Sequence, residues 1–325
     1  MGAAAVLPAV AVTMGDPHGI GPEILLTSLA RPSLRRLAHW VVIGDRGVLD
    51  RTARRLRLMS VLCAPRVSVV DVENVDRRRW QPGLLSAPAG RASYEYLEEA
   101  VRQWRQGRVQ AMVTAPVTKA AIQRAGIPFI GHTEFLARAT RSSPIAMMFV
   151  GGPLRVVLVT RHLALRDVPR HVTPKTVRET IRLTHEALRG WFGLRRPRVG
   201  VLGLNPHAGE AGSMGHEEEQ VLRPVIASLR RACPTLSGPL VPDAAFYDAY
   251  RGCYDALVCM YHDQALIPLK MVARDTGVNV TLGLPFVRTS PDHGTALDIA
   301  GRAIADPGAM IAAMTLAVRL CRRHE

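Results

Sequence analysis

The chain has 325 residues, of which 48% are hydrophobic, so it can bury one large core or two smaller ones. No apolar run approaches the ~20 residues of a membrane-spanning helix, and we expect no membrane insertion. The formal net charge is +15, but the arginines are scattered, with no basic tail and no interleaved aromatic residues. This distribution argues against a nucleic-acid-binding protein.

Short β-branched, apolar runs alternate with helical patterns along the chain. The predicted strands cover 8–14, 39–44, 66–72, 109–115, 145–151, 154–160, 198–204, 255–261 and 278–284. The predicted helices cover 22–30, 46–57, 91–106, 174–190, 216–231 and 305–321. This alternation predicts an α/β protein with a largely parallel sheet. Ligands of such sheets gather at the carboxyl ends of the strands, so functional residues are expected just after each strand.

The first strand runs into GDPHGIGPEI, Gly15 to Ile24. Its glycines permit a tight turn, and Pro22 suits the first position of a helix. Because the motif is not GxGxxG, it predicts no Rossmann dinucleotide site. The strand directly follows the N-terminus without a basic segment, so we expect no signal peptide. Five cysteines without CxxC spacing indicate free thiols and a cytoplasmic location.

Three histidines follow predicted strands at similar positions: His162 in VLVTRH, His207 in LGLNPH and His262 in CMYH. A single histidine most often has a structural role, but three at one sheet edge predict a site for Zn²⁺ or a similar divalent ion. Asp263 can serve there as a further ligand or as a hydrogen-bond acceptor for His262.

A second group of residues indicates an anionic substrate. Only three of the 42 basic residues are lysines, and two of these, Lys119 and Lys270, lie inside unusual motifs. Lys270, Asn279 and Arg288 occur in segments that otherwise suit burial, and together they can bind phosphate and carboxylate. In GHTEFLA, Gly131 to Ala137, we expect Thr133 to be the N-cap of a helix whose amino end, with His132, can hold an anion.

At these residues the chain resembles the 4-hydroxythreonine-4-phosphate dehydrogenase family of vitamin B6 biosynthesis. Seven motifs, in order and over nearly the whole chain, carry the resemblance: GDPHGIGPEI, VTAPVTKAAI, GHTEFLA, LVTRHLALRDV, GLNPHAGE, MYHDQALIPLK and VNVTLGLPFVRTSPDHGTALDIAG. GIGPEI and HGTALDIAGRAIADPGAMI more distantly resemble the isocitrate and isopropylmalate dehydrogenases. This implies their non-Rossmann α/β fold, with two subdomains and a central cleft. By analogy, residues 1–130 and 290–325 form one subdomain and 131–289 the other.

The resemblance also implies the site. The metal ligands fall on His162, His207 and His262, contributed by both subunits of a homodimer whose active site lies at the interface. The substrate-binding positions are His132, Thr133, Lys270, Asn279 and Arg288. The cofactor, NAD or NADP, is expected near Leu284, Asp292, Gly294 and Asp298, and the metal is Zn²⁺, Mg²⁺ or Co²⁺. Lys270 is the best candidate for the general acid–base group, with help from Asp263.

The implied reaction is oxidation of 4-phosphooxy-L-threonine to a 3-oxo acid, which loses CO₂ to give 3-amino-2-oxopropyl phosphate in pyridoxal 5′-phosphate biosynthesis. The chain departs from the family pattern at Val117-Thr118-Lys119 and at His18. Relatives that oxidise aromatic cis-dihydrodiol carboxylates can also carry His18, so such a substrate stays open, as does 4-phospho-D-threonate or 4-phosphoerythronate. The intact GHTEFLA and LGLPFVRTSPDHG motifs favour a phosphorylated substrate. A metal-dependent hydrolase is the alternative from a different enzyme class.

Overall fold

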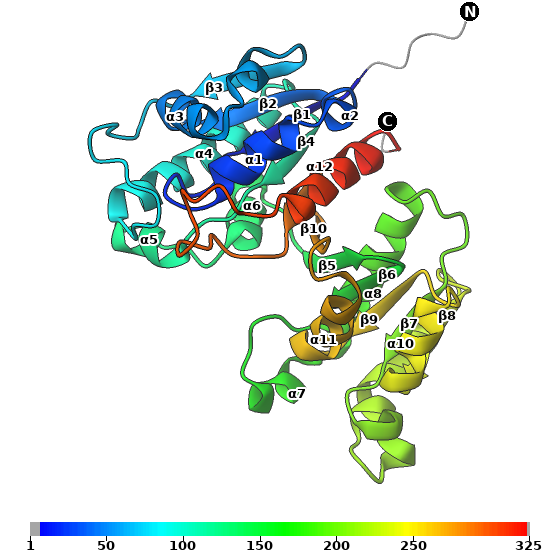
Figure 1. Cartoon of the computed structure of the whole chain (residues 1–325). Helices are drawn as coiled ribbons and strands as arrows, with labels where there is room; N and C mark the ends of the chain where they lie inside the picture. Colours follow the sequence, from blue (N-terminus) through cyan, green and yellow to red (C-terminus); the bar gives the residue numbers. More distant parts are fainter. Residues whose placement is uncertain (1–6, 324–325) are drawn as a thin grey trace, which may run out of the picture. The chain divides into compact units, whose positions relative to one another are not determined.

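The computed structural model describes residues 7–323, which form two compact units (Figure 1). Unit 1 comprises residues 7–142 and 284–323, and unit 2 comprises residues 143–283. Residues 131–142 and 284–289, predicted to lie in the central subdomain, belong instead to the compact unit formed by the two ends of the chain. His132, Thr133 and Arg288 are therefore part of unit 1.

Unit 1 contains five parallel strands in the order β3-β2-β1-β4-β11. They are β1 (Ala9–Thr13), β2 (His39–Gly44), β3 (Val67–Asp71), β4 (Ala111–Thr114) and β11 (Val287–Pro291). Residues of β1 and β4 on both faces are buried, as expected for a sheet covered by helices on both sides. Because the strands are parallel, the loops that follow them all lie at one edge of the sheet, the carboxyl edge.

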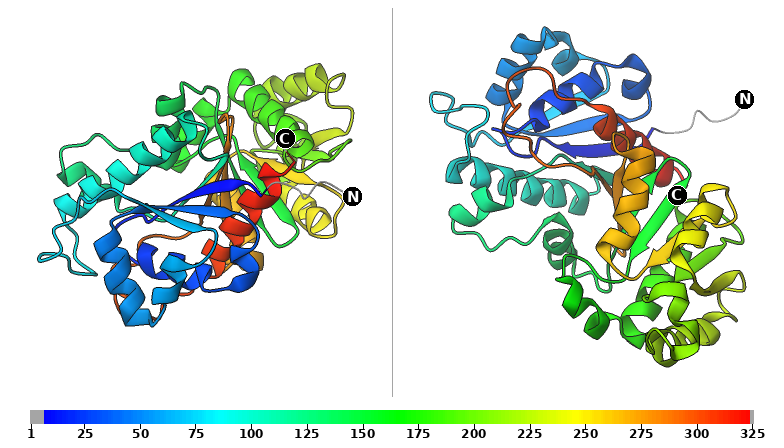
Figure 2. Two further views of the ribbon diagram at one scale, coloured as in Figure 1. Left: turned by 90° about the horizontal axis from the view of Figure 1, so that it is seen from above. Right: turned by 60° about the horizontal axis from the view of Figure 1, so that its bottom comes forward.

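Helices cover both faces of this sheet. α1 (Gly21–Leu29), α3 (Arg46–Leu56) and α12 (Gly308–Cys321) pack on one face, and α4 (Ala87–Arg105) with α5 (Lys119–Arg124) packs on the other, as the left view of Figure 2 shows. Asp45 caps α3 by accepting a hydrogen bond from the amide of Val48 at 2.9 Å, and Ser86 caps α4. The unit also contains α2 (Pro32–Arg35), the 3₁₀ segment Met59–Cys63 and α6 (His132–Thr140).

Unit 2 contains six strands in the order β10-β5-β6-β9-β7-β8. They are β5 (Ala146–Gly151), β6 (Leu154–Leu158), β7 (Val199–Leu202), β8 (Leu236–Leu240), β9 (Ala256–Cys259) and β10 (Val278–Leu282). β5 is antiparallel to both neighbours, whereas β6, β9, β7 and β8 run parallel. The carboxyl ends of β6, β9 and β7 therefore meet at one edge.

The helices of unit 2 bury apolar faces against this sheet. α10 (Pro242–Tyr250) and α11 (His262–Ala273) contribute Ala249, Leu266 and Leu269 to a core that includes Phe149 and Leu257. α8 (Pro174–Gly190), which begins with a capping box at Thr173, and α9 (Arg223–Leu229) complete the unit. Shorter elements are the 3₁₀ turn Leu165–Asp167, α7 (Val168–His171), the turn Pro206–Gly212 and the π-helical turn Glu218–Leu222.

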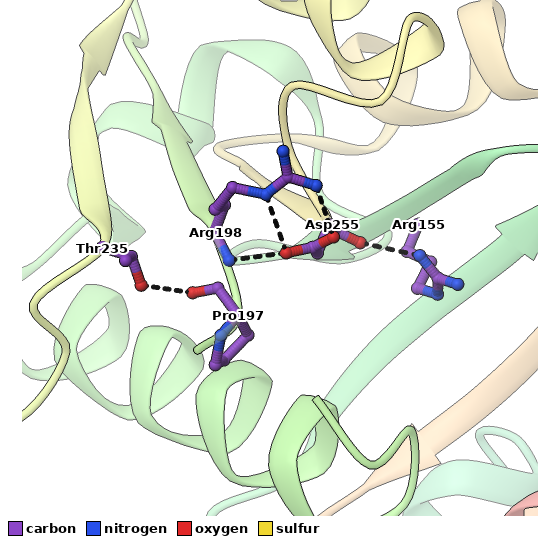
Figure 3. Close-up of polar contacts among 5 residues, drawn as sticks. All are labelled: Arg155, Pro197, Arg198, Thr235 and Asp255. Atoms are coloured by element: carbon purple, nitrogen blue, oxygen red, sulfur yellow. Dashed lines mark hydrogen bonds and ion pairs between the residues drawn. The ribbon is translucent and has the colours of Figure 1, made fainter. Parts of the chain in front are cut away.

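The amino ends of β7 and β9 are joined by charged residues (Figure 3). The carboxylate of Asp255 accepts hydrogen bonds from the backbone amide of Arg198 at 2.7 Å and from its guanidinium at 2.9 and 3.2 Å. Arg155, on β6, donates to the backbone carbonyl of Asp255 at 3.0 Å. Nearby, the hydroxyl of Thr235 donates to the carbonyl of Pro197 at 2.6 Å. These contacts fix the register of neighbouring strands.

The predicted α/β fold is confirmed, and every predicted strand is present. The strands β8 and β11 were missed because their sequences, LSGPL and VRTSP, contain proline and lack an apolar pattern. Within residues 7–323, the cysteines form no disulfide. None of the described helices combines the length and apolarity needed to cross a membrane.

Candidate active site

The loop after β1 is held rigidly at the carboxyl edge of unit 1. Gly15 has a φ of +76°, and a Cβ on Gly21 would overlap the carbonyl oxygen of Met14, so this tight turn requires glycine. His18 is buried; its backbone amide donates to Asp16 at 2.9 Å, and its Nδ1 lies 2.9 Å from the carbonyl oxygen of Leu84. His18, left open by the sequence, therefore has a structural role that links two loops.

The helix α6 begins at His132, with Gly131 rather than the predicted Thr133 as its N-cap. Glycine has no side chain to cap the helix, and none of the α6 amides receives a side-chain cap from that position. Thr133 is buried at 4% exposure. The amino end of α6 therefore presents backbone N–H groups and the positive end of the helix dipole, a combination that suits an anion.

His132 lies at this helix end with an unsatisfied nitrogen. Its Nε2 is buried without a hydrogen-bond partner in the described part of the chain. Burial, reinforced by the positive charges of Arg288 and Lys119, holds the pKa of His132 well below its ordinary value, and a hydrogen bond to the backbone of Ala115 opposes this only weakly. The imidazole is therefore neutral at pH 7. Because Nδ1 carries the proton shared with Ala115, Nε2 presents a lone pair.

Arg288 projects from β11 and is only 2% exposed. Its Nη2 and Nε donate to the hydroxyl of Thr114 at 2.6 and 3.2 Å. Burial lowers the pKa of Arg288 to about 10, and Glu134 opposes that shift, so the guanidinium stays charged at neutral pH. Lys119 also reaches this place, because its Nζ lies 3.7 Å from the position of a Cβ on Gly131. Two cations and a helix amino end thus converge on His132.

Three of the four predicted cofactor residues, Asp292, Gly294 and Asp298, lie in the loop that follows β11. The fourth, Leu284, is buried and precedes the start of β11. The loop is fixed to its neighbours by Thr295, whose carbonyl accepts from the amide of Ile20 and whose hydroxyl lies 3.0 Å from that of Thr118.

The carboxylate of Glu23 fastens the far end of the same loop. Burial raises its pKa, and hydrogen bonds from the backbone of Gly301 and Ala303 work in the opposite direction. Its second oxygen, Oε2, is buried without a partner among the described residues. The sequence analysis gives Glu23 no role, so this loop-fixing contact was not predicted.

In unit 2, the structure brings together two of the three predicted metal ligands. His162 follows β6 and His262 begins α11 after β9, and their ring centroids lie 5.7 Å apart. The Nδ1 of His262 is 2.6 Å from Oδ1 of Asp263. This contact orients the ring so that Nε2 can face a metal, the arrangement in which a carboxylate supports a histidine ligand. The backbone of His162 has a φ of +22°, which indicates local strain.

His207 follows β7 on a turn with an unusual backbone. Its φ is +51°, and the next four residues are also left-handed, a conformation that costs roughly 1–2 kcal/mol for each non-glycine residue. Glu218, which is fully buried, stabilises the start of this turn by accepting from the amides of Leu204 at 2.7 Å and Asn205 at 2.8 Å and from the Asn205 side chain at 3.0 Å. Strain of this kind is most often retained where function requires it.

No group of three or more His, Cys, Asp or Glu side chains within residues 7–323 lies close enough to hold a metal ion. His162 and His262 form a pair, and His207 lies at the carboxyl edge of the same sheet on its own turn. A single chain thus presents two neighbouring imidazoles, a number that leaves coordination positions for further ligands.

The remaining predicted residues lie on α11 and β10. Asp263 and Lys270 are exposed and, being seven positions apart, occupy the same side of α11. Pro268 lies inside this helix. Because proline lacks a backbone N–H and is disfavoured in a helix interior, the sequence did not predict α11. Asn279 is 8% exposed on β10, and its Oδ1 has no hydrogen-bond partner among the described residues. This buried acceptor suits an N–H or O–H group of a ligand.

Sequence reasoning missed three further residues: Thr114, Glu134 and Glu218. Thr114 ends β4 and Glu134 lies in the first turn of α6, and both gain importance only through their proximity to Arg288. Glu218 lies in a run of three glutamates, a pattern that predicts the solvent-exposed first turn of a helix. The π-helical turn that buries one of the three is not visible in the sequence.

Comparison with known proteins agrees with this arrangement. The model of the family described as "Pyridoxal phosphate biosynthetic protein PdxA" matches residues 36–317. A 4-hydroxythreonine-4-phosphate dehydrogenase from Geobacter metallireducens is 43% identical over 97% of this chain and 96% of the relative. A D-threonate 4-phosphate dehydrogenase from Cupriavidus necator is 40% identical over 98% of both chains. The crystal structure of 4-hydroxythreonine-4-phosphate dehydrogenase from Klebsiella pneumoniae superposes with a TM-score of 0.88 and 36% identity, covering 98% of this chain and 100% of that one.

Proposed function

This chain belongs to the PdxA family of pyridoxal phosphate biosynthetic proteins, and on that premise we propose that it oxidises 4-phosphooxy-L-threonine with NAD or NADP. The observation that carries the proposal is the environment of His132. A neutral imidazole with a buried, unpartnered Nε2 lies beside Arg288 and Lys119 at the uncapped amino end of α6. These groups suit a phosphorylated substrate that also offers hydrogen-bond donors.

The phosphate would bind at the amino end of α6. Arg288 supplies a guanidinium already oriented by Thr114, so little side-chain entropy is lost when the anion arrives. Lys119 adds a second charge, and the backbone N–H groups at His132 and Thr133 complete the donor set. Asn279, through its unpartnered Oδ1, would accept a hydrogen bond from the amino or hydroxyl group of the substrate.

His162, His207 and His262 would hold the divalent ion. Their chemistry fits, because His162 and His262 are neighbours and Asp263 orients the ring of His262. When bound, the ion supplies Lewis acidity that favours loss of a hydroxyl proton and polarises a ketone. Metal analysis of the purified protein would identify the resident ion among Zn²⁺, Mg²⁺ and Co²⁺.

The proposed reaction has two balanced steps. In the first, the C3 hydroxyl of the substrate loses its proton to a base and its C3 hydrogen leaves as hydride to the nicotinamide, giving the 3-oxo acid. In the second, the bond from C2 to the carboxylate breaks, CO₂ leaves, and C2 takes up a proton to give 3-amino-2-oxopropyl phosphate. Lys270 is the proposed acid–base group, and Asp263, which contacts His262, is the proposed positioning group.

A second copy of the chain would complete the site. Beside Asp263 and Lys270, the outer side of α11 exposes the apolar side chains of Ile267 at 60% and Met271 at 83%. Leu165, in the segment that follows His162, is 69% exposed. We propose that these apolar residues form part of a homodimer interface that brings further ligands to His162 and His262. A reducing cytoplasm, predicted from the cysteines, is the proposed location.

One relative favours a second candidate substrate. The Cupriavidus necator relative, named for D-threonate 4-phosphate, is almost as similar to this chain as the relatives named for 4-hydroxythreonine 4-phosphate. Both substrates carry the phosphate that Arg288 and Lys119 would bind. They differ at C2, where one has an amino group and the other a hydroxyl, and either group can donate to Asn279.

The test is reduced-nicotinamide absorbance with purified protein, using 4-phosphooxy-L-threonine or 4-phospho-D-threonate, each with NAD and with NADP, with and without a chelator. We expect chelator-sensitive reduction with 4-phosphooxy-L-threonine and a much lower kcat/KM for the threonate. A preference for the threonate would assign the chain to the second substrate. No reduction with either, or with a cis-dihydrodiol carboxylate, in fully metallated protein would reject the proposal.

A further inference from the structure

Two arginines of unit 1 lie over the indole of Trp80, and a third is bonded to one of them. The guanidinium carbons of Arg51 and Arg55, on α3, lie 6.0 and 5.9 Å from the ring centroid of Trp80. Arg77 lies so close over Gly47 that a Cβ there would overlap its guanidinium. Arg51 donates to the backbone carbonyl of Arg77 at 2.7 Å, which joins the helix to the loop. We call Arg51, Arg55 and Arg77 the arginine cluster.

The charge of the arginine cluster is not neutralised within the described chain. Nearby carboxylates pair with other arginines, Asp50 with Arg46 at 2.8 Å and Asp76 with Arg79 at 3.6 Å. Among residues 7–323, no member of the cluster forms an ion pair with a carboxylate; Arg51 and Arg55 instead donate to backbone carbonyls. Glu23 attracts Arg55 electrostatically, but its carboxylate accepts from the amides of Gly301 and Ala303. Three adjacent, exposed guanidinium groups favour an anion, and their forked donors match phosphate geometry.

The position of the arginine cluster points to a cofactor and not to a second substrate phosphate. Arg77 follows β3 and Gly301 follows β11, whereas Arg51 and Arg55 lie in the middle and in the last turn of α3, the helix after β2. Arg55 donates to the carbonyl of Gly301 at 2.9 Å, and the indole N–H of Trp80 donates to the carbonyl of Pro17 at 2.8 Å. The cluster is thus bonded to the loop that carries the predicted cofactor residues.

The distance along the sheet supports the same interpretation. β2 is three positions from β11 in the strand order, and at ~4.8 Å per strand this separation is on the order of 14 Å. A phosphate at the arginine cluster would therefore be remote from one held by Arg288. One extended dinucleotide can span the two places, with its nicotinamide near the substrate and its adenosine end near α3.

We propose that the arginine cluster binds the 2′-phosphate of NADP and gives the enzyme a preference for NADP over NAD. The inference rests on the proposed function for the identity of the cofactor as a nicotinamide dinucleotide. The 2′-phosphate is a dianion that NAD lacks, so only NADP uses the unneutralised guanidinium groups. Arg55, held against Gly301, would also couple occupation of the cluster to the loop after β11.

The experiment is calorimetric titration of the whole protein with 2′,5′-ADP and, separately, with 5′-ADP, which lacks the 2′-phosphate. We expect 2′,5′-ADP to bind at least ten times more tightly. Arg51→Gln and Arg77→Gln should each weaken 2′,5′-ADP binding about 10- to 100-fold and leave 5′-ADP binding unchanged. Arg54→Gln is the matched control, because Arg54 is an exposed arginine of the same helix and should change neither titration. Circular dichroism melting confirms that each variant is folded.

Equal affinity of wild-type protein for the two nucleotides would overturn the proposal, as would unchanged 2′,5′-ADP binding in both folded variants. Neither result affects the proposed dehydrogenase, which would then be NAD-dependent. Conversely, tight binding of 2′,5′-ADP that is lost in the variants supports the site even if no substrate is turned over. The two inferences can therefore fail separately.

Discussion

At the amino ends of β7 and β9, Arg198 and Asp255 bond to each other through three hydrogen bonds (Figure 3). At the carboxyl ends of the same two strands, His207 lies in a left-handed turn and His262 begins a helix with its ring beside that of His162. The amino edge pairs its charges and fixes strand register. The carboxyl edge retains backbone strain at His162 and His207 and holds the rings of His162 and His262 side by side, which the rest of the unit must support.

The largest expected effect comes from removing a histidine at the carboxyl edge. His207→Ala should remove the bound metal and lower turnover about 10³-fold, because the Lewis acidity contributes several kcal/mol to the transition state. Metal content by mass spectrometry and reduced-nicotinamide absorbance measure the two losses together. His171→Ala is the control, since His171 is an exposed histidine of the same unit. Full activity of metal-free His207→Ala would contradict the assignment.

A smaller loss of catalytic efficiency is expected from changing a residue at the carboxyl edge of unit 1. Arg288→Lys keeps a cation but cannot make both hydrogen bonds to Thr114, so the orientation toward the phosphate is lost. We expect the KM for the phosphorylated substrate to rise about 10- to 100-fold with little change in kcat. Steady-state kinetics measure both constants, and Arg124→Lys, at an exposed arginine, is the control. An unchanged KM would show that Arg288 does not bind the substrate phosphate.

The support for the strained turn can be tested next. The carboxylate of Glu218 accepts hydrogen bonds from the backbone amides of Leu204 and Asn205. In Glu218→Gln, an NH₂ group replaces one carboxylate oxygen, and it cannot accept these hydrogen bonds. The His207 turn should lose its fixed position, and metal affinity should fall about 10-fold or more. Titration with Zn²⁺ against a competing chelator measures it. Glu219→Gln is the matched control, because Glu219 is exposed and pairs with Arg223; equal metal affinity in both variants would mean that Glu218 serves folding alone.

The fold was largely predictable because β-branched runs such as HWVVIG indicate buried parallel strands. The sequence VRTSP does not indicate a strand, because it contains an arginine and a proline. The burial of that arginine depends on tertiary contacts. His162 and His262 could be placed at one edge because parallel strands bring their carboxyl ends together. The left-handed turn at His207 and the burial of Glu218 could not, since neither leaves a periodic signal. Arg51 and Arg55 are more than 20 residues before Trp80 in the chain, and only the structure places their guanidinium groups over its ring.

The smallest effect is expected at the amino edge, where Asp255→Asn removes a charge and keeps the side-chain shape. Burial raises the pKa of Asp255, but hydrogen bonds from Arg198 outweigh it and hold the pKa below its ordinary value. A carboxyl whose pKa is lower in the folded than in the unfolded protein stabilises the fold at pH values above its unfolded-state pKa. This contribution is lost as the pH falls through the folded-state pKa. Because the Arg198 side chain is 50% exposed, the pair contributes at most ~1 kcal/mol.

Asp255→Asn should therefore lower the Tm at pH 7 by about 2–4 °C, and its difference from wild type should shrink as the pH falls below about 4. The Tm from circular dichroism, measured across this pH range, gives both quantities. Asp275→Asn, at an exposed aspartate of the same unit, is the control. The kcat/KM at pH 7 should be unchanged, because none of the proposed binding or catalytic residues lies at the amino edge. A loss of kcat/KM comparable to that of Arg288→Lys would show that the two edges are coupled, and the division of roles between them would have to be abandoned.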